Sequence, residues 1–542
     1  MDIRPDHLKI VQDTLREHLP VEAEVWVFGS RANWTTKDSS DLDLAVEGAA
    51  RLDHKAMVRM EIAFEESELP YTVDVVDLNA VSKEFKKIVE GQKVPLPSVR
   101  FQAQANDGGW KRVTLGDVCT KIGSGATPRG GKDVYLDEGP YTLIRSQNVY
   151  NDGFHRDGLA FIGDSHANEL QNVEVFEEDV LLNITGDSVA RVCQVAPDVL
   201  PARVNQHVAI IRPDSDNLDA GYLRYYLASP EMQAMLLSWA GSGGTRNALT
   251  KGMIESLEIS LPPVSEQRAI AAILGALDDK IELNRRMNQT LEEMARAVFR
   301  DWFVDFGPVR AKLEGREPYL PPELWDLFPD RLVDSELGEI PEGWEVKALG
   351  DAVDILSGGT PKTSVPDYWD GGIPWYTAKD APSLSDIFVL TTERSITQAG
   401  VDNSSTKILP ARTTIISARG TVGRLACLGI PMAMNQTCYG IRGAEGYPDF
   451  FTYWNVRNTV NELKTRTHGT IFDTITRETF KIAEAVLAPT GVAQAFESVI
   501  TPVMDRISGN LNESRSLADQ RDTLLPKLVS GETTVRGRDR WR

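Results

Sequence analysis

Three aspartates and a Gly-Ser pair near the start of the chain have the residue types and spacing for phosphoryl-transfer chemistry. An apolar strand pattern, VEAEVWVF, runs directly into Gly29-Ser30 at a predicted turn. Asp41 and Asp43 lie on the next predicted strand, where alternation puts both carboxylates on one face, and Asp74 lies on a later apolar strand. Such a set can hold two Mg²⁺ ions, while the turn can present N–H groups and a hydroxyl to a triphosphate.

The order of these elements resembles the minimal nucleotidyltransferase domains of the polymerase-β superfamily. The resemblance covers residues 1–100 and implies that the Gly-Ser pair contacts phosphate and that the three aspartates bind metal, with Mg²⁺ and a nucleoside triphosphate as cofactors. Asn33 and Trp34 stand where many such domains carry a further glycine. Two interpretations remain open: an active enzyme that modifies a partner protein, sometimes a helical toxin in this superfamily, or a degenerate domain used only for docking.

The bulk composition limits the remaining possibilities. A chain of 542 residues is too long for one core, so several domains are expected. The four cysteines form no CxxC or Cys/His cluster, which gives no sign of a zinc site or a disulfide framework. No apolar run reaches membrane-spanning length, so we expect a cytoplasmic protein without a membrane partner. The net charge of −21 weighs against nucleic acid as a partner, although a local basic face suffices for phosphate contacts.

The strongest feature of the whole chain is an internal repeat. GGWKRVTLGDVCTKIGSGATP at 108–128 corresponds to EGWEVKALGDAVDILSGGTP at 342–361, and NQHVAIIRP corresponds to NQTCYGIRG. Short β-branched and aromatic runs bounded by turn residues predict that both copies are mainly β. Residues 150–171 and 381–403 differ between the copies, as expected if two related modules recognise different things.

A long helical pattern follows each copy of the repeat. In the first, apolar residues recur at three- and four-residue steps with Asn284 in a polar slot, which predicts a coiled-coil seam. The second repeats the seam less regularly, and Pro502 is expected to kink the helix or to mark a restart. The two helices pair most simply with each other in an antiparallel arrangement; the alternative is that each packs only on its own module.

Residues 108–532 resemble the DNA-specificity subunits of type I restriction-modification systems. The carrying motifs are GWKRVTLGDV, GWEVKALGDA, YWDGGIPWYTAKD, ARGTVGRLA, NQTCYGIR and PPVSEQRAIAAILGALDDKIELNRRMNQTLEEM. The resemblance implies two target-recognition domains that each read half of a split site in double-stranded DNA. It also implies helices that bind two modification subunits, which carry S-adenosylmethionine, and a motor-nuclease subunit that joins for cleavage. The specificity region itself then needs no cofactor and performs no chemistry.

The expected fold class is therefore α+β multidomain, with a small nucleotidyltransferase-like α/β domain, two mainly-β recognition domains, and two long antiparallel coiled-coil helices related by a pseudo-twofold. A purely structural scaffold is the remaining alternative. The expected segments are 1–100 (nucleotidyltransferase-like domain), 108–263 (recognition domain 1), 264–306 (first spacer helix), 307–341 (linker), 342–490 (recognition domain 2), 491–532 (second spacer helix) and 533–542 (basic tail).

Two sets of residues carry the predicted interactions of the specificity region. Loop residues with side chains suited to phosphates and base edges are the expected DNA contacts. These are Arg145, Gln147, Asn148, Arg246 and Asn247 in the first module, and Lys379, Arg419, Thr470 and Arg477 in the second. Apolar positions of the two long helices are expected to dock the modification subunits, namely Ile281, Met287, Leu291, Met294, Ile507 and Leu511.

Overall fold

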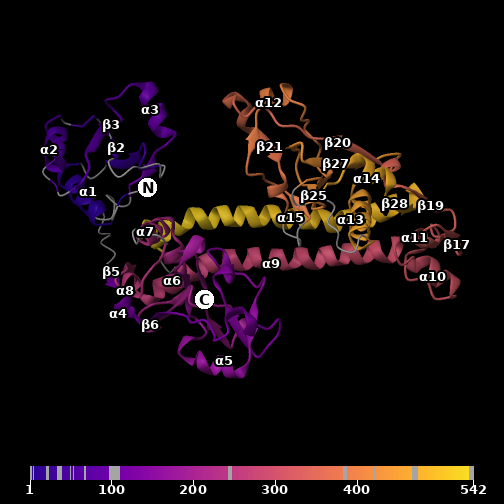
Figure 1. The fold of residues 1–542 in the computed structure, drawn as a ribbon, viewed down its shortest axis with the longest axis horizontal. Helices are drawn as coiled ribbons and strands as arrows, with labels where there is room; N and C mark the ends of the chain where they lie inside the picture. The colour runs from indigo at the N-terminus through magenta and orange to yellow at the C-terminus, as the bar shows by residue number, and fades with distance from the viewer. Residues whose placement is uncertain are drawn as a thin grey trace, which may run out of the picture. The chain divides into compact units, whose positions relative to one another are not determined.

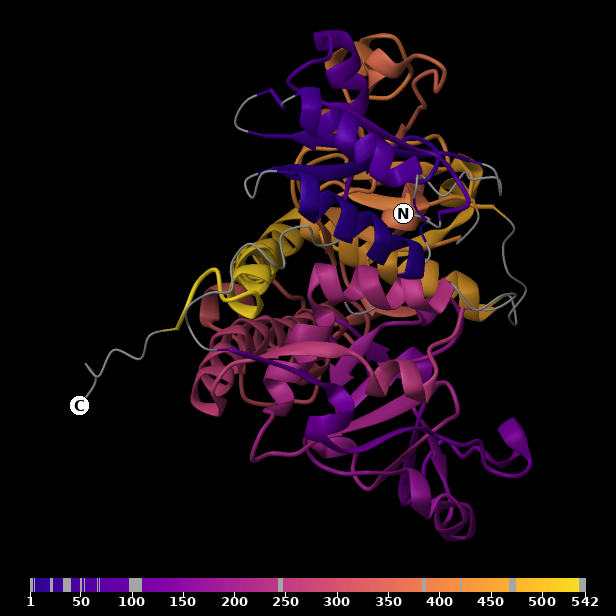
Figure 2. The ribbon, with the colours of Figure 1, turned by 90° about the vertical axis from the view of Figure 1, so that its left-hand side faces the viewer.

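The computed structural model divides the chain into two compact units, Met1–Asp278 with Asp519–Arg542, and Asp279–Ala518 (Figures 1 and 2). The architecture is mixed α/β, with a small N-terminal domain and long helices. In the part of the chain that is described, no helix is long and apolar enough to cross a membrane. The structure describes all residues except 1–2, 4, 20–22, 33–39, 49–50, 53, 66, 68, 97–109, 242–246, 383–386, 420–421, 467–473 and 536–542.

The N-terminal domain is a four-stranded sheet in the order β3-β2-β1-β4. Strand β1 runs antiparallel to β2, while β2 and β3 are parallel because helix α2 crosses between them. Apolar side chains of α1 and α2 pack on the sheet, with Leu15, Leu44 and Met60 fully buried. The elements are α1 (Pro5–His18), β1 (Glu24–Phe28), β2 (Leu42–Glu47), α2 (His54–Glu65), β3 (Val73–Asp77), α3 (Lys83–Glu90) and β4 (Val94–Pro95).

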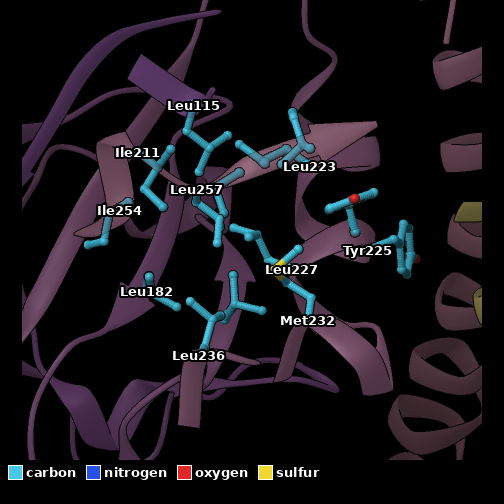
Figure 3. Close-up of a cluster of buried hydrophobic side chains, with 14 of the residues drawn as sticks. Leu115, Leu182, Ile211, Leu223, Tyr225, Leu227, Met232, Leu236, Ile254 and Leu257 are labelled. Atoms are coloured by element: carbon cyan, nitrogen blue, oxygen red, sulfur yellow. The ribbon is translucent and has the colours of Figure 1, made fainter. Parts of the chain in front are cut away.

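The first repeat copy, residues 111–261 and here called module 1, contains two four-stranded sheets in the orders β10-β7-β14-β11 and β13-β12-β15-β6. Helices α6, α7 and α8 cover a core of leucines, isoleucines and tyrosines (Figure 3). Its main elements are β5 (Lys111–Thr114), α4 (Leu115–Val118), β6 (Cys119–Ser124), β7 (Tyr141–Ile144), β8 (Val149–Tyr150), β9 (Gly153–Phe154), β10 (Ala160–Ile162), α5 (Asp164–Glu169), β11 (Glu174–Val175), β12 (Val180–Asn183), β13 (Val192–Gln194), β14 (Ala202–Val204), β15 (Val208–Pro213), α6 (Ala220–Ala228), α7 (Pro230–Gly241), α8 (Lys251–Glu255) and β16 (Glu258–Leu261).

The second copy, residues 345–487 and here called module 2, contains a five-stranded sheet, β20-β27-β24-β25-β22, and a three-stranded sheet, β23-β21-β26. Strand β19 pairs with β28, as β5 pairs with β16 in module 1. Its main elements are β19 (Glu345–Ala348), β20 (Val353–Ser357), β21 (Trp369–Tyr376), β22 (Phe388–Val389), β23 (Ser395–Ile396), α12 (Gln398–Asp402), β24 (Thr414–Ser417), β25 (Leu425–Leu428), β26 (Ala433–Met434), β27 (Cys438–Gly443), α13 (Asp449–Arg466), α14 (Arg477–Ile482) and β28 (Glu484–Leu487).

A tight glycine contact recurs in both modules and explains the shared Ser-Gly-x-Thr-Pro motif. A Cβ placed on Gly125 would lie 2.1 Å from the Val204 carbonyl oxygen, and a Cβ on Gly358 would lie 2.1 Å from the Asn435 carbonyl oxygen. Both distances are far inside van der Waals contact, so only glycine fits. The Asn-Gln motif closes the same site as a turn, because Asn205 Oδ1 accepts the His207 N–H at 3.1 Å and Asn435 Oδ1 accepts the Thr437 N–H at 3.0 Å.

The segment predicted as a linker, 307–341, contains short helices and strands although it shows no apolar period. Its apolar residues are too widely spaced to show a period, yet Val309, Phe328 and Ile340 are buried in the core of the second unit. Burial of these side chains fixes short elements that a periodicity search does not detect. They are α10 (Gly307–Leu313), α11 (Pro322–Trp325), β17 (Leu332–Ser335) and β18 (Gly338–Pro341).

Two helices of 40 residues each, α9 (Val264–Phe303) and α15 (Thr490–Val529), dominate the described chain. Of the two expectations for Pro502, a restart is wrong, because α15 is one continuous helix through this residue, while a kink stays a prediction. Proline lacks an N–H and costs one intrahelical hydrogen bond, but the neighbouring turns of α15 are held by packing. Met504 and Ile500 on either side are buried against the aromatic core.

Within the second unit, α9 and α15 run antiparallel and meet through buried asparagines. Asn510 Nδ2 donates to Asn288 Oδ1 at 2.8 Å, and both side chains are almost fully buried. Asn284, also buried, donates to Glu513 Oε2 at 2.8 Å. Toward the end of α9 the contact between the helices is aromatic: the rings of Phe299 and Phe496 form a T-shaped pair with their centroids 5.7 Å apart.

Between residues 287 and 299 the buried positions of α9 lie one residue beyond the predicted seam, whereas Ile270, Leu274 and Asn284 are buried as predicted. Met294, expected in the seam, is 53% exposed, while Ala295 and Phe299 are buried in its place. The sequence pattern selects the most apolar residues, whereas the structure buries Asn288, because its amide finds a partner on α15. Within the first unit, the helices meet again where Arg521 donates to Asp278 Oδ1 at 2.8 Å.

We predict that Asn288→Ala destabilises the second unit by about 1–3 kcal/mol, because it leaves the buried Asn510 amide without an acceptor. Asn512→Ala is the control, since Asn512 is an exposed asparagine of α15, the helix that carries Asn510. Urea unfolding followed by circular dichroism, with hydrogen exchange of peptides from α9 and α15, measures the difference. If both variants lowered the free energy of unfolding equally, the Asn288–Asn510 pair would not be stabilising.

Candidate functional site

Two predicted metal ligands lie side by side on the sheet of the N-terminal domain. Asp43 on β2 is the direct register partner of Asp74 on the parallel strand β3. Asp41 immediately precedes β2 and is exposed, two residues before Asp43 and on the same face. Burial raises the pKa of the Asp43 carboxyl above its ordinary value, and the carboxylates of Asp74 and Asp41 raise it further. These residues thus concentrate negative charge at one end of the β2–β3 pair.

The Gly-Ser turn closes against this acidic group. Gly29 follows β1 in the left-handed backbone region, at φ +74°, and a Cβ on it would lie 2.2 Å from Asp43 Oδ2. Glycine is favoured at this position, since a side chain would strain the left-handed backbone and displace the Asp43 carboxylate. Ser30 lies in the same turn. The structure therefore brings the predicted phosphate-binding turn next to a predicted metal ligand, whereas Asn33 and Trp34 lie outside the described residues.

The aspartates do not form a complete metal site here. In the described part of the chain, no group of three His, Cys, Asp or Glu side chains is placed to hold one ion. The oxygen donors of Asp43 and Asp74 are those that Mg²⁺ prefers, and a cation between these carboxylates would offset their mutual repulsion. The donor chemistry fits the implied ion, while the three-ligand set stays a prediction.

In module 1 the predicted DNA contacts gather at the short 3₁₀ helix η3 (Ser146–Asn148), which follows β7. Gln147 is exposed, and its Nε2 donates to the Gly158 carbonyl at 3.1 Å. Arg145 donates to the same carbonyl. Asn148, by contrast, is fully buried and holds the turn through the Arg145 N–H and two loop carbonyls. The prediction of Asn148 as a DNA contact is wrong, because its buried amide makes all of these hydrogen bonds within the module.

The other predicted contacts are spread around the modules. Asn247 is exposed, and its carbonyl accepts the Gly186 N–H at 3.2 Å. In module 2, Lys379 lies on the turn after β21 and Arg419 follows β24, both exposed. Arg477 is also exposed, but its guanidinium donates to the Ile355 carbonyl and to Ser357, which favours a structural role. Arg246 and Thr470 lie outside the described residues.

Two further polar side chains of module 1 escaped the sequence analysis. His207 Nδ1 lies 2.6 Å from Thr185 Oγ1, and both residues are partly exposed beside the Asn-Gln turn. A single threonine and a single histidine give no pattern in a sequence. The sequence signal for His207 is the residue that follows the repeated Asn-Gln pair, which is histidine in the first copy and threonine in the second.

The predicted docking residues of the helices divide into two classes. Met294 is exposed, and the neighbouring Leu283, which was not predicted, is 52% exposed. Ile507 is buried in the contact between α9 and α15 and cannot meet a partner there. The remaining residues are half-buried: Ile281, Met287, Leu291 and Leu511.

Comparison with known protein families assigns both parts of the chain. Residues 107–293 and 341–484 match the type I restriction modification DNA specificity domain. Residues 9–98 match the polymerase beta nucleotidyltransferase domain. The two specificity matches cover the two copies of the repeat, and the nucleotidyltransferase match contains Gly29 and all three aspartates.

Individual relatives give the same division. The chain is 26% identical over 468 residues to the type I restriction enzyme HindI specificity subunit of Haemophilus influenzae, covering 78% of this chain and 99% of the relative. Over 89 residues it is 40% identical to the probable protein adenylyltransferase MntA of the same organism, covering 16% of this chain and 77% of the relative. The solved S subunit of a type I restriction-modification system from M. genitalium is 15% identical, with a TM-score of 0.48 over 78% of this chain and 97% of that one.

We predict that Asp74→Asn stabilises the N-terminal domain near neutral pH in the presence of a chelator. Because the folded-state pKa of Asp43 is raised, folding favours its protonated form, so stability falls as pH rises through the range above the ordinary aspartate pKa. Removing the Asp74 charge makes that fall smaller. Hydrogen exchange of β1 and β2 peptides across this range measures it, with Glu61→Gln on α2 as the control. An unchanged pH dependence would show that the two carboxylates do not interact.

Proposed function

The chain belongs to the family of type I restriction-modification DNA specificity subunits, with a polymerase-β-type nucleotidyltransferase domain before it, and on that premise we propose that it directs a restriction-modification complex to a split DNA sequence. Modules 1 and 2 each read one half of the site. The segments 108–263 and 342–490 are the two recognition domains in this proposal, followed by the spacer helices at 264–306 and 491–532.

One observation carries this proposal: the modules repeat one internal frame and differ in what they expose. The glycine contact and the Asn-Gln turn recur in both. Exposed polar side chains at the end of β7 and of β21 differ between them, with Gln147 in one module and Lys379 in the other. A common scaffold with different surface residues is the arrangement that two half-sites of unlike sequence require.

The long helices set the spacing between the half-sites in this proposal. We infer that they pair along their length as an antiparallel coiled coil with pseudo-twofold symmetry, supported by the Asn288–Asn510 contact in one unit and the Asp278–Arg521 contact in the other. A helix of 40 residues is about 60 Å long at 1.5 Å per residue. A rod of fixed length favours two half-sites at a fixed distance on the duplex.

The partners follow from the family. We infer that two modification subunits, which carry S-adenosylmethionine, dock on the spacer helices, where Met294 and Leu283 are exposed apolar side chains. A motor-nuclease subunit completes the complex for cleavage. These subunits also supply phosphate contacts, which reconciles DNA binding with a net charge of −21. The candidate DNA contacts that keep exposed side chains are Gln147, Asn247, Lys379, Arg419 and Arg477.

A second function concerns the N-terminal domain. We propose that it transfers a nucleotide from a nucleoside triphosphate to a helical partner protein, with Asp41, Asp43 and Asp74 holding Mg²⁺ and Gly29-Ser30 binding phosphate. The contact between Gly29 and the Asp43 carboxylate supports this, because it places the turn and the acidic group together. Mg²⁺ would neutralise charge on the triphosphate, and the protein residues would orient it.

Exchange of residues 110–262 for the corresponding module of another specificity subunit is expected to change one half of the methylated sequence and to leave the other half intact. Methylation mapped by sequencing of DNA treated with the chain and its modification subunits measures this. An unchanged sequence would overturn the assignment of module 1 as a reader.

For the second function, incubation of the full chain with labelled ATP, Mg²⁺ and the protein encoded beside it is expected to label that protein. The double variant Asp41→Ala/Asp43→Ala should abolish labelling, since it removes two proposed metal ligands. Glu61→Ala on the exposed face of α2 is the control and should label as the wild type does. Absence of metal-dependent labelling in the wild type would favour the docking role.

A further inference from the structure

The two modules share equivalent backbone hydrogen bonds at one sheet edge. In module 1, the Asn205 N–H donates to the Ile144 carbonyl at 3.0 Å. In module 2, the Asn435 N–H donates to the Tyr376 carbonyl at 2.9 Å. Strands β7 and β21 therefore end at equivalent points, and each passes into a 3₁₀ turn, η3 (Ser146–Asn148) and η9 (Ala378–Asp380).

The turns themselves are pinned in the same way. Asn148 Oδ1 accepts the Arg145 N–H at 3.0 Å, and Asp380 Oδ2 accepts the Thr377 N–H at 2.7 Å. The residue before Asn148, Gln147, is exposed, and so is the residue before Asp380, Lys379. Counting from the equivalent strand ends, Gln147 of module 1 corresponds to Lys379 of module 2.

A second pair of contacts aligns the neighbouring strands. The Ile184 N–H donates to the His207 carbonyl at 3.0 Å, and the Ala418 N–H donates to the Thr437 carbonyl at 2.8 Å. His207 therefore corresponds to Thr437. The residue that follows each donor gives one more pair, Thr185 and Arg419.

Within module 1 the three positions form one patch. Asn183, at the end of β12, donates through Nδ2 to the Ser146 carbonyl at 2.8 Å, which joins the strand end to the η3 turn. Two residues on, Thr185 Oγ1 lies 2.6 Å from His207 Nδ1. The backbone hydrogen bonds described above recur in both modules, and so does the exposed glutamine beside them, Gln206 or Gln436.

We propose that these three equivalent positions are the base-reading positions of each module, and that their different side chains give the two half-sites different bases. Lysine and arginine favour the O6 and N7 acceptors of guanine, whereas glutamine pairs with N6 and N7 of adenine. Module 2 therefore reads guanine, and module 1 reads adenine at the position facing its glutamine. The positions are 147, 185 and 207 in module 1 and 379, 419 and 437 in module 2.

The environment of Gln147 prepares its amide for this contact. One Nε2 proton is directed to the Gly158 carbonyl, at 3.1 Å. An amide has two N–H donors and a carbonyl acceptor, so the second proton and Oε1 remain for a bidentate contact with adenine. Fixing the side chain before DNA binds lowers the entropy lost in the complex.

The inference rests on the proposed reading of a split site and is tested by substitutions that exchange the two chemistries. The full chain with its modification subunits is incubated with randomised duplexes, and the methylated sequences are determined. Gln147→Lys is expected to change one base of one half-site from adenine toward guanine, by about ten-fold or more in preference, since a bidentate contact discriminates by that order. Arg419→Gln is expected to weaken a guanine in the other half-site only.

Matched controls separate the outcomes. Gln171→Lys makes the same substitution at an exposed site of module 1 outside the patch, and should leave the sequence unchanged. Lys407→Gln serves the same purpose in module 2. If the wild type methylates no split sequence, the proposed function fails. If it does, and Gln147→Lys and Arg419→Gln leave every base preference unchanged or weaken all sequences equally, the reading positions are wrong while the function stands.

Discussion

The polar layer between α9 and α15 is the constraint on which the proposed spacing of the DNA half-sites depends. Apolar side chains tolerate a shift of one helix along another, because one leucine replaces another at little cost. Buried amides do not, since a shift would leave the Asn510 and Asn288 side chains, which now bond at 2.8 Å, facing groups that cannot accept or donate. We infer that the buried asparagines favour one register of the two helices, as the proposed spacer requires.

In modules 1 and 2 the backbone contacts are shared, while the exposed side chains differ. Their glycine contacts exclude any side chain at Gly125 and Gly358, and the Asn-Gln turns close on those glycines. Because the frame is held by backbone atoms, the residues that it presents to solvent can differ without cost to the fold. This explains why an acidic chain can still present cations locally, as at Lys379 and Arg419 of module 2.

Much of this organisation could be predicted from the sequence, because repeated motifs and long amphipathic helices are visible in one dimension. The errors have physical causes. Asn148 has the side chain of a DNA contact, but its amide is buried in the η3 turn. The buried face of α9 differs from the predicted one because Asn288 is buried with a hydrogen-bond partner on α15. A hydropathy pattern cannot predict this, since it treats every asparagine as a surface residue. Thr185 has no counterpart pattern in the sequence, and its equivalence to Arg419 rests on backbone hydrogen bonds that only the folded modules contain.

The acidic group of the N-terminal domain argues for a ligand. Asp43 and Asp74 face each other across a parallel strand pair, and burial, followed by the nearby carboxylates of Asp74 and Asp41, raises the pKa of Asp43. Like charges opposite each other in a sheet destabilise it, so a domain used only for docking gains nothing from them. A divalent cation would convert the repulsion into binding energy, and the turn at Gly29, closed against Asp43, would bring phosphate to the same place. The contact between Gly29 and Asp43 is therefore the one that would recognise a metal-bound triphosphate.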